Sequence, residues 1–131
     1  MRVLIVDDSA MVGERLAAML AALPEKIQLI GVAQDVPQAI QAFQALKPDA
    51  VILDIRMPGG SGLDVLEAIK NDRPETVVMM LTNYPYPQYR QKCLEAGADY
   101  FFDKAAGFDQ VPPILQQLIR DSQFGLGPSA L

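Results

Sequence analysis

The sequence contains no histidine among its 131 residues, and it has a single cysteine, Cys93. Without imidazole the chain cannot form a Ser-His-Asp triad or a zinc site with histidine ligands, so any histidine in its chemistry must belong to another protein. A single cysteine cannot form an intramolecular disulfide. This is consistent with a reducing compartment, and we expect a cytoplasmic protein.

Positive charge is also scarce, with 11 Lys and Arg against 16 Asp and Glu and a net charge of -5. Nucleic acids and anionic membranes require concentrated positive charge, so we expect no direct nucleic-acid binding and no membrane association. Long hydrophobic runs are missing as well. The first apolar run, residues 3–6, meets two aspartates and is too short for a signal sequence or a membrane helix.

Half of the residues are hydrophobic, which is enough for the core of one globular domain of this length. Short runs of branched apolar residues alternate with segments that carry apolar residues at helical spacing. The runs that predict strands are residues 3–6, 27–32, 50–53, 77–81 and 100–102. The segments that predict helices are residues 12–23, 36–43, 63–69, 88–96 and 111–119.

Residues at the predicted helix ends agree with this assignment. Asp35 and Ser61 are each followed three residues later by a side chain that can reach back, Gln38 or Asp64, as in a capping box. The two prolines at 112–113 fit only the first turn of a helix, so the fifth helix should begin close to them.

Strict alternation of strands and helices predicts an α/β fold of the doubly wound class, with a five-stranded parallel sheet and helices on both of its faces. We expect one domain over residues 1–121. Residues 122–131 are small, contain glycine and lack a clear period, so we expect a flexible C-terminal tail.

Polar residues gather where the predicted strands end. Asp7 and Asp8 follow the first strand, Asp54 the third, Thr82 the fourth and Lys104 the fifth. In a doubly wound sheet the site forms outside the carboxyl ends of the strands. If the first and third strands are neighbours, about 5 Å apart, three carboxylates meet there. Such a cluster recruits a cation, and a set of oxygen ligands suits Mg²⁺.

A Mg²⁺ ion held by carboxylates and water takes phosphate oxygens as its remaining ligands, so the site is expected to receive a phosphoryl group. Asp54 can act as the nucleophile, because carboxylates form covalent phosphoryl intermediates. Lys104 supplies positive charge for the phosphoryl oxygens and Thr82 a hydroxyl donor.

Four stretches of the sequence resemble the receiver domain of two-component response regulators, over nearly all of residues 1–121. They are VLIVDDS at 3–9, VILDIRMPGGSG at 51–62, LT at 81–82 and AGADYFFDK at 96–104. The resemblance implies the flavodoxin-like strand order 2-1-3-4-5. It also implies that Asp54 is the phosphorylated residue and that Asp7, Asp8, Asp54 and the backbone carbonyl of Arg56 hold Mg²⁺.

The resemblance further implies that Thr82, the backbone of Asn83 and Lys104 bind the phosphoryl group, and that Thr82 and Phe101 are the switch residues. Phe101 is also expected to be a core residue. The donor would be a phosphohistidine of a sensor kinase or a histidine phosphotransfer protein. The fourth helix, fifth strand and fifth helix would form the switched surface, which contacts a downstream protein and is a possible dimer interface.

Two departures from the family pattern stand close to this site. Receivers commonly have a cis-proline after the lysine, whereas Lys104 is followed by Ala105, for which a trans peptide is the default. The position after Thr82 is usually small, whereas residues 83–87 read NYPYP, a bulky loop that we expect to affect the lifetime of the phosphoryl group. Phe101 lacks the hydroxyl of the more familiar tyrosine.

The leading interpretation is a phosphorylated signalling domain that is not an enzyme apart from slow self-dephosphorylation. Two other functions stay open. One is a pseudo-receiver, an interaction module that keeps the fold without the chemistry. The other is a phosphatase with an aspartyl nucleophile of the haloacid dehalogenase type, although its D-x-D pattern is absent after the first strand. Taken singly, Asp7 or Asp8 fits a helix cap equally well.

Overall fold

The computed structural model describes residues 1–123, and its centre is a five-stranded parallel sheet with the order β2-β1-β3-β6-β7. Counted along the chain within this sheet, the order is 2-1-3-4-5, which confirms the predicted doubly wound fold. The strands are β1 (Arg2–Val6), β2 (Gln28–Ala33), β3 (Ala50–Leu53), β6 (Val77–Thr82) and β7 (Tyr100–Asp103).

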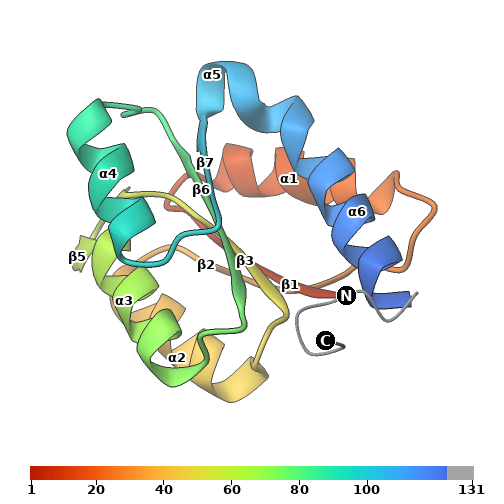
Figure 1. Cartoon of the computed structure of the whole chain (residues 1–131), viewed down its shortest axis with the longest axis horizontal. Coiled ribbons are helices and arrows are strands. Elements are labelled where there is room, and N and C mark those ends of the chain that lie inside the picture. Colours follow the sequence, from red (N-terminus) through yellow and green to blue (C-terminus); the bar gives the residue numbers. More distant parts are fainter. Residues whose placement is uncertain (124–131) are drawn as a thin grey trace.

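Helices cover both faces of the sheet (Figure 1). One layer holds α1 and α6, and the other holds α2, α3 and α4, each packed on its own cluster of buried side chains. The long helices are α1 (Ala10–Ala21), α2 (Val36–Leu46), α3 (Gly62–Asp72), α4 (Pro87–Glu95) and α6 (Val111–Gln123).

The interior strand β1 shows why this sequence needs two helical layers. Val3 and Ile5 point into the cluster beneath α1 and α6, while Leu4 and Val6 point into the opposite cluster. All four side chains are buried. Because successive side chains of a strand face opposite sides of the sheet, an uninterrupted apolar strand must be covered on both faces.

The helix ends confirm the predicted capping residues. Asp35 accepts a hydrogen bond from the Gln38 N–H at 2.8 Å. Ser61 and Asp64 form a capping box at the start of α3. The helix α6 begins at Val111, directly before the two prolines.

Three short elements were not predicted from the sequence. The first is a hairpin of β4 (Arg56–Met57) and β5 (Gly60–Ser61), which lies shortly after β3 in the chain. The others are α5 (Lys104–Gly107) and the 3-10 turn η1 (Phe108–Gln110). They are too short to show a period of 2 or 3.6, and unlike the comparably short strand β3 they are not marked by an uninterrupted run of branched apolar residues.

The start of α5 uses the backbone N–H of Ala105. Asp103 caps this helix by accepting a hydrogen bond from the Ala105 N–H at 2.9 Å. Proline has no N–H and could not donate this bond. Lys104 therefore lies in the first turn of a helix that is built around the non-proline residue.

The helix α6 continues through Gln123, two residues beyond the predicted domain end at 121. The rest of the predicted tail, residues 124–131, lies outside the described residues. Within residues 1–123, no helix is long and apolar enough to cross a membrane.

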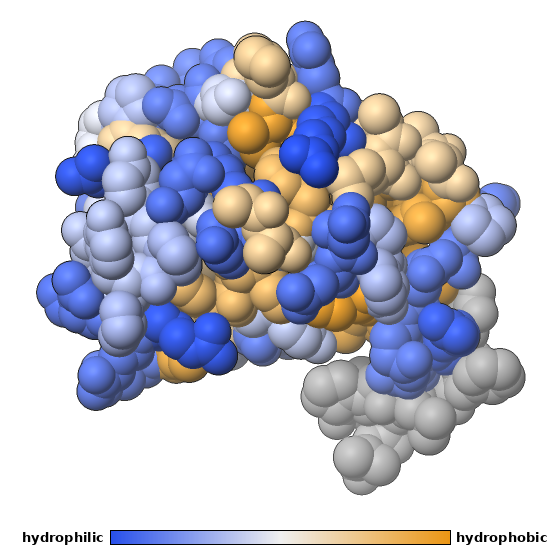
Figure 2. Space-filling view, turned by 90° about the horizontal axis from the view of Figure 1, so that it is seen from above, coloured by the Kyte–Doolittle hydropathy of each residue, from blue (hydrophilic) through white to orange (hydrophobic). Residues whose placement is uncertain are grey.

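On the face seen in Figure 2, hydrophobic and hydrophilic residues are interspersed, and the orange patches are bordered by blue. Among the described residues, the large hydrophobic side chains with notable exposure are Met11, Val32, Tyr86 and Leu94. Only Tyr86 belongs to the bulky loop that the sequence singles out beside the site.

Candidate functional site

The sheet register brings Asp7 and Asp54 to the same edge. Val6 pairs with Leu53, and each of these strands ends one residue before its aspartate. The Asp54 N–H donates to the Val6 carbonyl at 3.0 Å, and the Asp7 N–H donates to the Ala33 carbonyl at 2.9 Å. Main-chain hydrogen bonds therefore continue past the strand ends and fix both aspartates side by side.

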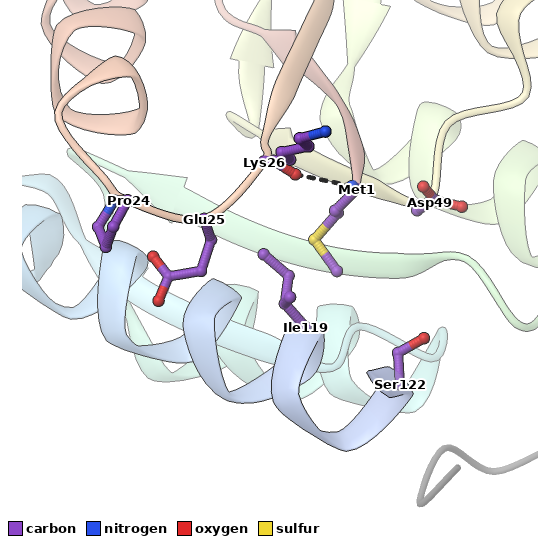
Figure 3. A pocket seen from close by; sticks show the side chains of 7 residues that line it. All are labelled: Met1, Pro24, Glu25, Lys26, Asp49, Ile119 and Ser122. Carbon is purple, nitrogen blue, oxygen red and sulfur yellow. Dashed lines mark hydrogen bonds between the residues drawn. The ribbon is translucent and has the colours of Figure 1, made fainter. Parts of the chain in front are cut away.

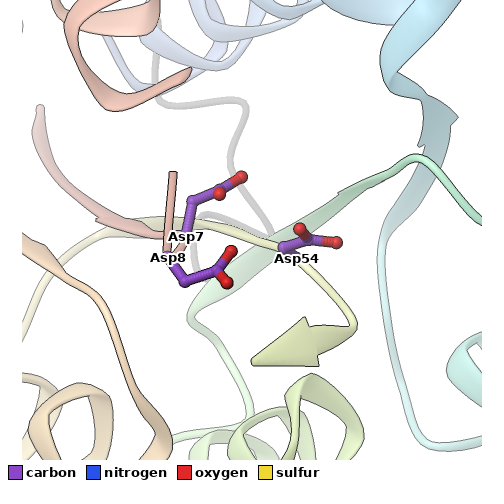
Figure 4. A group of neighbouring side chains, drawn as sticks. All are labelled: Asp7, Asp8 and Asp54. Atoms are coloured by element: carbon purple, nitrogen blue, oxygen red, sulfur yellow. The ribbon is translucent and has the colours of Figure 1, made fainter. Parts of the chain in front are cut away.

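Asp7, Asp8 and Asp54 each place a carboxylate oxygen within 4.8 Å of the others (Figure 4). Asp7 is 3% and Asp54 5% exposed, whereas Asp8 is open to solvent. Oxygen ligands alone, with one side of the cluster open, suit a small hard cation that keeps some of its water. The donor set therefore fits Mg²⁺.

Lys104 lies between the two buried aspartates. Its Nζ is 2.7 Å from Asp7 Oδ2 and 2.7 Å from Asp54 Oδ2. Burial lowers the pKa of the Lys104 ammonium, but the hydrogen bonds to Asp54 and Asp7 outweigh burial and hold this pKa above its ordinary value. The lysine is therefore charged at neutral pH and neutralises part of the acidic cluster.

One ammonium does not fully compensate the cluster, as Asp7 shows. Burial raises the pKa of the Asp7 carboxyl, and the opposing hydrogen bonds from Lys104 and the Ser9 N–H do not reverse this rise. The Ser9 N–H donates to Asp7 Oδ1 at 2.9 Å. The buried Asp7 carboxyl is therefore harder to ionise than an exposed one, and a cation beside it would favour its charged form.

Asp54 is held by a second partner on its other oxygen. The Ile55 N–H donates to Asp54 Oδ1 at 2.7 Å. The Ile55 carbonyl in turn accepts hydrogen bonds from the Gly62 N–H at 2.6 Å and from Ser61 Oγ at 3.3 Å. The start of α3 thus fixes the loop that carries Asp54.

Gly62 is the closest neighbour of this loop. A Cβ at position 62 would overlap the Asp54 carbonyl oxygen and crowd the Asp54 carbonyl carbon and Ile55 Cα. All three are backbone atoms, which cannot rotate away as a side chain can. The absence of a side chain at Gly62 therefore lets α3 begin directly against Asp54.

The structure places Thr82 and Lys104 at the ends of the adjacent strands β6 and β7, at the same edge as the aspartates. Thr82 is fully buried, and its Oγ1 accepts a hydrogen bond from the Tyr84 N–H at 3.0 Å. This bond leaves the hydroxyl hydrogen free to be donated elsewhere. Asn83 is exposed beside it.

Phe101 is a buried residue of the core cluster that α2, α3 and α4 cover. Its ring centroid lies 5.8 Å from the Arg90 guanidinium carbon. The prediction that Phe101 is a core residue is confirmed. Its role as a switch residue stays a prediction.

One contact at the site was not predicted from the sequence. The guanidinium carbon of Arg56 lies 4.4 Å from the centroid of the Tyr84 ring. The sequence indicated Arg56 only for its carbonyl and Tyr84 only for its bulk. Each of the two residues follows a predicted site residue by two, so the sequence placed both of them near the site. No periodic pattern in a sequence shows that residues so far apart in the chain are in contact.

A separate groove lies at the opposite edge of the sheet, where Met1 and Asp49 precede β1 and β3 (Figure 3). None of the predicted site residues lines it. Among the described residues, its lining consists of Met1, Pro24, Glu25, Lys26, Asp49, Ile119 and Ser122.

Comparisons with known proteins agree with this geometry. The chain is 28% identical over 123 residues to the response regulator GacA of Pseudomonas aeruginosa, with 94% of this chain and 57% of GacA covered. It spans about half or less of the length of the curated relatives it matches.

Two of the solved structures that are similar to this chain illustrate the match. The response regulator domain of Thermotoga maritima CheB has a TM-score of 0.79 at 31% identity, covering 92% of this chain and 94% of that one. The CheX-CheY-BeF3-Mg+2 complex of Borrelia burgdorferi has a TM-score of 0.82 at 27% identity, covering 91% and 89%. The family model described as the response regulator receiver domain matches residues 3–116. The chain therefore belongs to the response regulator receiver domain family.

Proposed function

We propose that this chain accepts a phosphoryl group on Asp54 from a phosphohistidine of a sensor kinase or a histidine phosphotransfer protein in the cytoplasm. Phosphoryl acceptance is the general function of the family to which the chain belongs. The observation that carries the proposal is the placement of Asp54, which is buried, bonded to Lys104 and within 4.8 Å of two further carboxylates.

Asp7, Asp8, Asp54 and the backbone carbonyl of Arg56 would hold Mg²⁺. When bound, this ion neutralises negative charge on the phosphoryl oxygens as they approach the carboxylates. The carboxylate and carbonyl oxygens of these residues are ligands of the type that Mg²⁺ binds in proteins. A relative supports this assignment, since the CheY of Borrelia burgdorferi is seen in a complex with CheX, BeF3 and Mg+2.

Transfer forms one bond and breaks one. A carboxylate oxygen of Asp54 attacks the phosphorus, the P–N bond of the donor breaks, and the donor imidazole leaves with the electron pair. Both carboxylate oxygens already accept a hydrogen bond, from Ile55 and from Lys104. Each oxygen keeps a further lone pair, so these bonds orient the nucleophile without blocking it.

Lys104 serves the product as well as the free site. An ammonium has three N–H donors, and Lys104 uses two of them on Asp7 and Asp54. The Nζ can therefore also donate to a phosphoryl oxygen. The Thr82 hydroxyl and the Asn83 backbone N–H are the donors on the adjacent strand end. Together they would replace the water that solvates the phosphoryl oxygens.

The signal would pass to another protein through the surface formed by α4, β7 and α6. Phosphorylation adds about -1.5 to -2 charge beside Thr82, by analogy with other phosphorylated side chains. A change at Thr82 reaches β7 directly, because Thr82 pairs with Asp103. We assign no enzymatic activity to the chain beyond slow self-dephosphorylation, and the same surface is a possible dimer interface.

The test is phosphorylation by acetyl phosphate with Mg²⁺, followed by Phos-tag electrophoresis. The wild-type protein should give a retarded band that hydroxylamine removes, because hydroxylamine cleaves acyl phosphates. Asp54→Asn should give no such band. Asp72→Asn, which changes an exposed aspartate at the end of α3, is the matched control and should label like the wild type.

Two results would refute the proposal. An unshifted wild-type protein that also shows no saturable Mg²⁺ site would indicate a pseudo-receiver. Multiple turnovers of a generic phosphate ester, lost in Asp7→Asn, would indicate a phosphatase.

A further inference from the structure

The two loops that flank the acceptor are joined by a contact that phosphoryl transfer itself does not require. Arg56 follows Asp54 by two residues, and Tyr84 follows Thr82 by two. The Arg56 guanidinium carbon lies 4.4 Å from the Tyr84 ring centroid. A guanidinium over an aromatic ring is attracted by the negative face of that ring. We call this contact the clasp.

Tyr84 is also bound to the predicted switch residue. Its backbone N–H donates to Thr82 Oγ1 at 3.0 Å. Thr82 is fully buried, so few other partners are within its reach. The ring of Tyr84 is therefore held by Arg56 and its backbone by Thr82, and a displacement of either partner acts on Tyr84.

From Tyr84 the contacts continue to α4. The Tyr84 and Tyr86 ring centroids lie 6.3 Å apart, and those of Tyr86 and Tyr89 lie 5.8 Å apart. Tyr86 is the N-cap residue of α4, but it makes no side-chain capping bond. Cys93 is the one buried residue of this helix. The first turn of α4 thus depends on these three rings, which we call the tyrosine cluster.

We infer that the clasp holds the tyrosine cluster and the start of α4 in the unphosphorylated arrangement, and that it opens when Asp54 is phosphorylated. This inference rests on the proposed function and adds its route to α4. Phe101 has no ring hydroxyl that could link the site to α4. The clasp links Arg56 and Thr82 to that helix through Tyr84.

Both residues that hold Tyr84, Arg56 at its ring and Thr82 at its backbone, are drawn away by the same event. The Thr82 Oγ1 moves off the Tyr84 N–H when the side chain rotates toward a phosphoryl oxygen. The new negative charge also attracts the Arg56 guanidinium, two residues from Asp54. Charge-assisted hydrogen bonds to phosphate are stronger than a cation–π contact at an exposed site, so the phosphoryl group wins over the ring. Arg56 is exposed.

The test is an NMR comparison of the free protein with its Mg²⁺ and beryllofluoride complex. In the free protein the Tyr84 ring current should move the Arg56 side-chain proton resonances upfield. Tyr84→Phe should keep this upfield shift, because it keeps the ring, and Tyr84→Leu should abolish it. In the beryllofluoride complex of the wild type the upfield shift should be lost. A ¹⁹F resonance of bound beryllofluoride shows independently that the complex has formed.

Affinity gives a second measurement. If the clasp favours the unphosphorylated arrangement, its removal lowers the cost of the change. Tyr84→Leu should then bind beryllofluoride at least about threefold more tightly than the wild type, while Tyr84→Phe should match the wild type.

The outcomes separate the two claims. A bound ¹⁹F resonance with an unchanged Arg56 shift would overturn the clasp and leave the proposed function standing. An Arg56 shift in the free protein that is equal in Tyr84→Leu would overturn it too, because the stack would then be absent. No bound ¹⁹F resonance at saturating Mg²⁺ and beryllofluoride would overturn the proposed function and the inference together.

Discussion

Lys104 supplies the positive charge that compensates the two buried aspartates. It is the ammonium seen between Asp7 and Asp54, at 2.7 Å from each. Removing one partner of a buried ion pair leaves the other charge uncompensated, which is costly, whereas an exposed lysine contributes little.

We therefore expect Lys104→Met to lower the free energy of unfolding by roughly 3 kcal/mol in EDTA at pH 7. Urea denaturation measures this loss. The control is Lys92→Met, which changes an exposed lysine of α4 and should stay within about 0.5 kcal/mol of the wild type. A loss as small as that of the control would contradict the role given to Lys104.

The raised pKa of Asp7 predicts an unusual pH dependence. Burial holds this pKa above 3.8 in the folded state, so the folded protein keeps a proton that the unfolded chain has released. Stability in EDTA therefore falls as the pH rises from 3.8 through the folded-state pKa.

Asp7→Asn removes this titration and leaves Asp54 as a partner for Lys104. We expect the variant to be more stable than the wild type at pH 7 in EDTA, because the buried carboxyl of the wild type must ionise there at a cost. The difference should close as the pH approaches 3.8. Asp72→Asn, an exposed control, should show no such pattern in the same urea titrations.

At the scale of elements, α3 and the loop that carries Asp54 form one unit. Gly62 begins α3 and touches the backbone of Asp54. We expect Gly62→Ala to destabilise the fold by about 3 kcal/mol, because the added carbon overlaps backbone atoms. Gly13→Ala is the matched control within α1. There the new Cβ meets Val32 Cγ1 at 3.4 Å, and helix propensity favours alanine by up to about 1 kcal/mol. Chemical denaturation of both variants shows whether steric overlap or helix propensity determines the effect of the added methyl group.

The helix α4 should be the weakest of the long helices. It buries only Cys93 and has no side-chain cap, whereas α3 buries four residues and begins with a capping box. Local opening is easier where fewer apolar contacts hold an element. Hydrogen exchange should show α4 amides at least about tenfold less protected than α3 amides. Equal protection in the two helices would count against this reading of the contacts.

Sequence patterns predicted the long elements and missed the short ones for a physical reason. A strand such as residues 50–53 is visible as an uninterrupted apolar run, and the stripe of α6 is visible because its apolar residues repeat over several helical turns. The hairpin β4–β5 and the helix α5 have no room for a period. Their causes are single contacts, such as the Asp103 cap on Ala105, which follow from the fold and not from a repeat.

The candidate site divides in the same way. Asp7, Asp54 and Lys104 were predictable, because topology alone places strand ends together. The contact of Arg56 with Tyr84 was not, because it depends on where two irregular loops lie in space. Sequence reasoning thus predicted which side chains meet at the strand ends and missed the contact that joins the loops around them.

For the molecule as a whole, Mg²⁺ should act as a stabilising ligand. An ion that binds only the folded state adds about 2.7 kcal/mol to the free energy of unfolding at a hundred times its Kd. We expect Mg²⁺ to raise the thermal midpoint of the wild type and of Asp72→Asn. Asp8→Asn, which removes the exposed member of the acidic cluster, should lose most of this rise. NaCl at equal ionic strength is the control, and an equal rise with NaCl would show general screening and no bound ion.

The continuation of main-chain bonds past β1 and β3 has a lasting consequence. Asp7 and Asp54 are anchored by their own amides, so their backbone positions stay adjacent and only side-chain rotation can separate the two carboxylates. The two acids therefore remain close neighbours in the folded protein, and the stability of the fold depends on how much positive charge lies beside them.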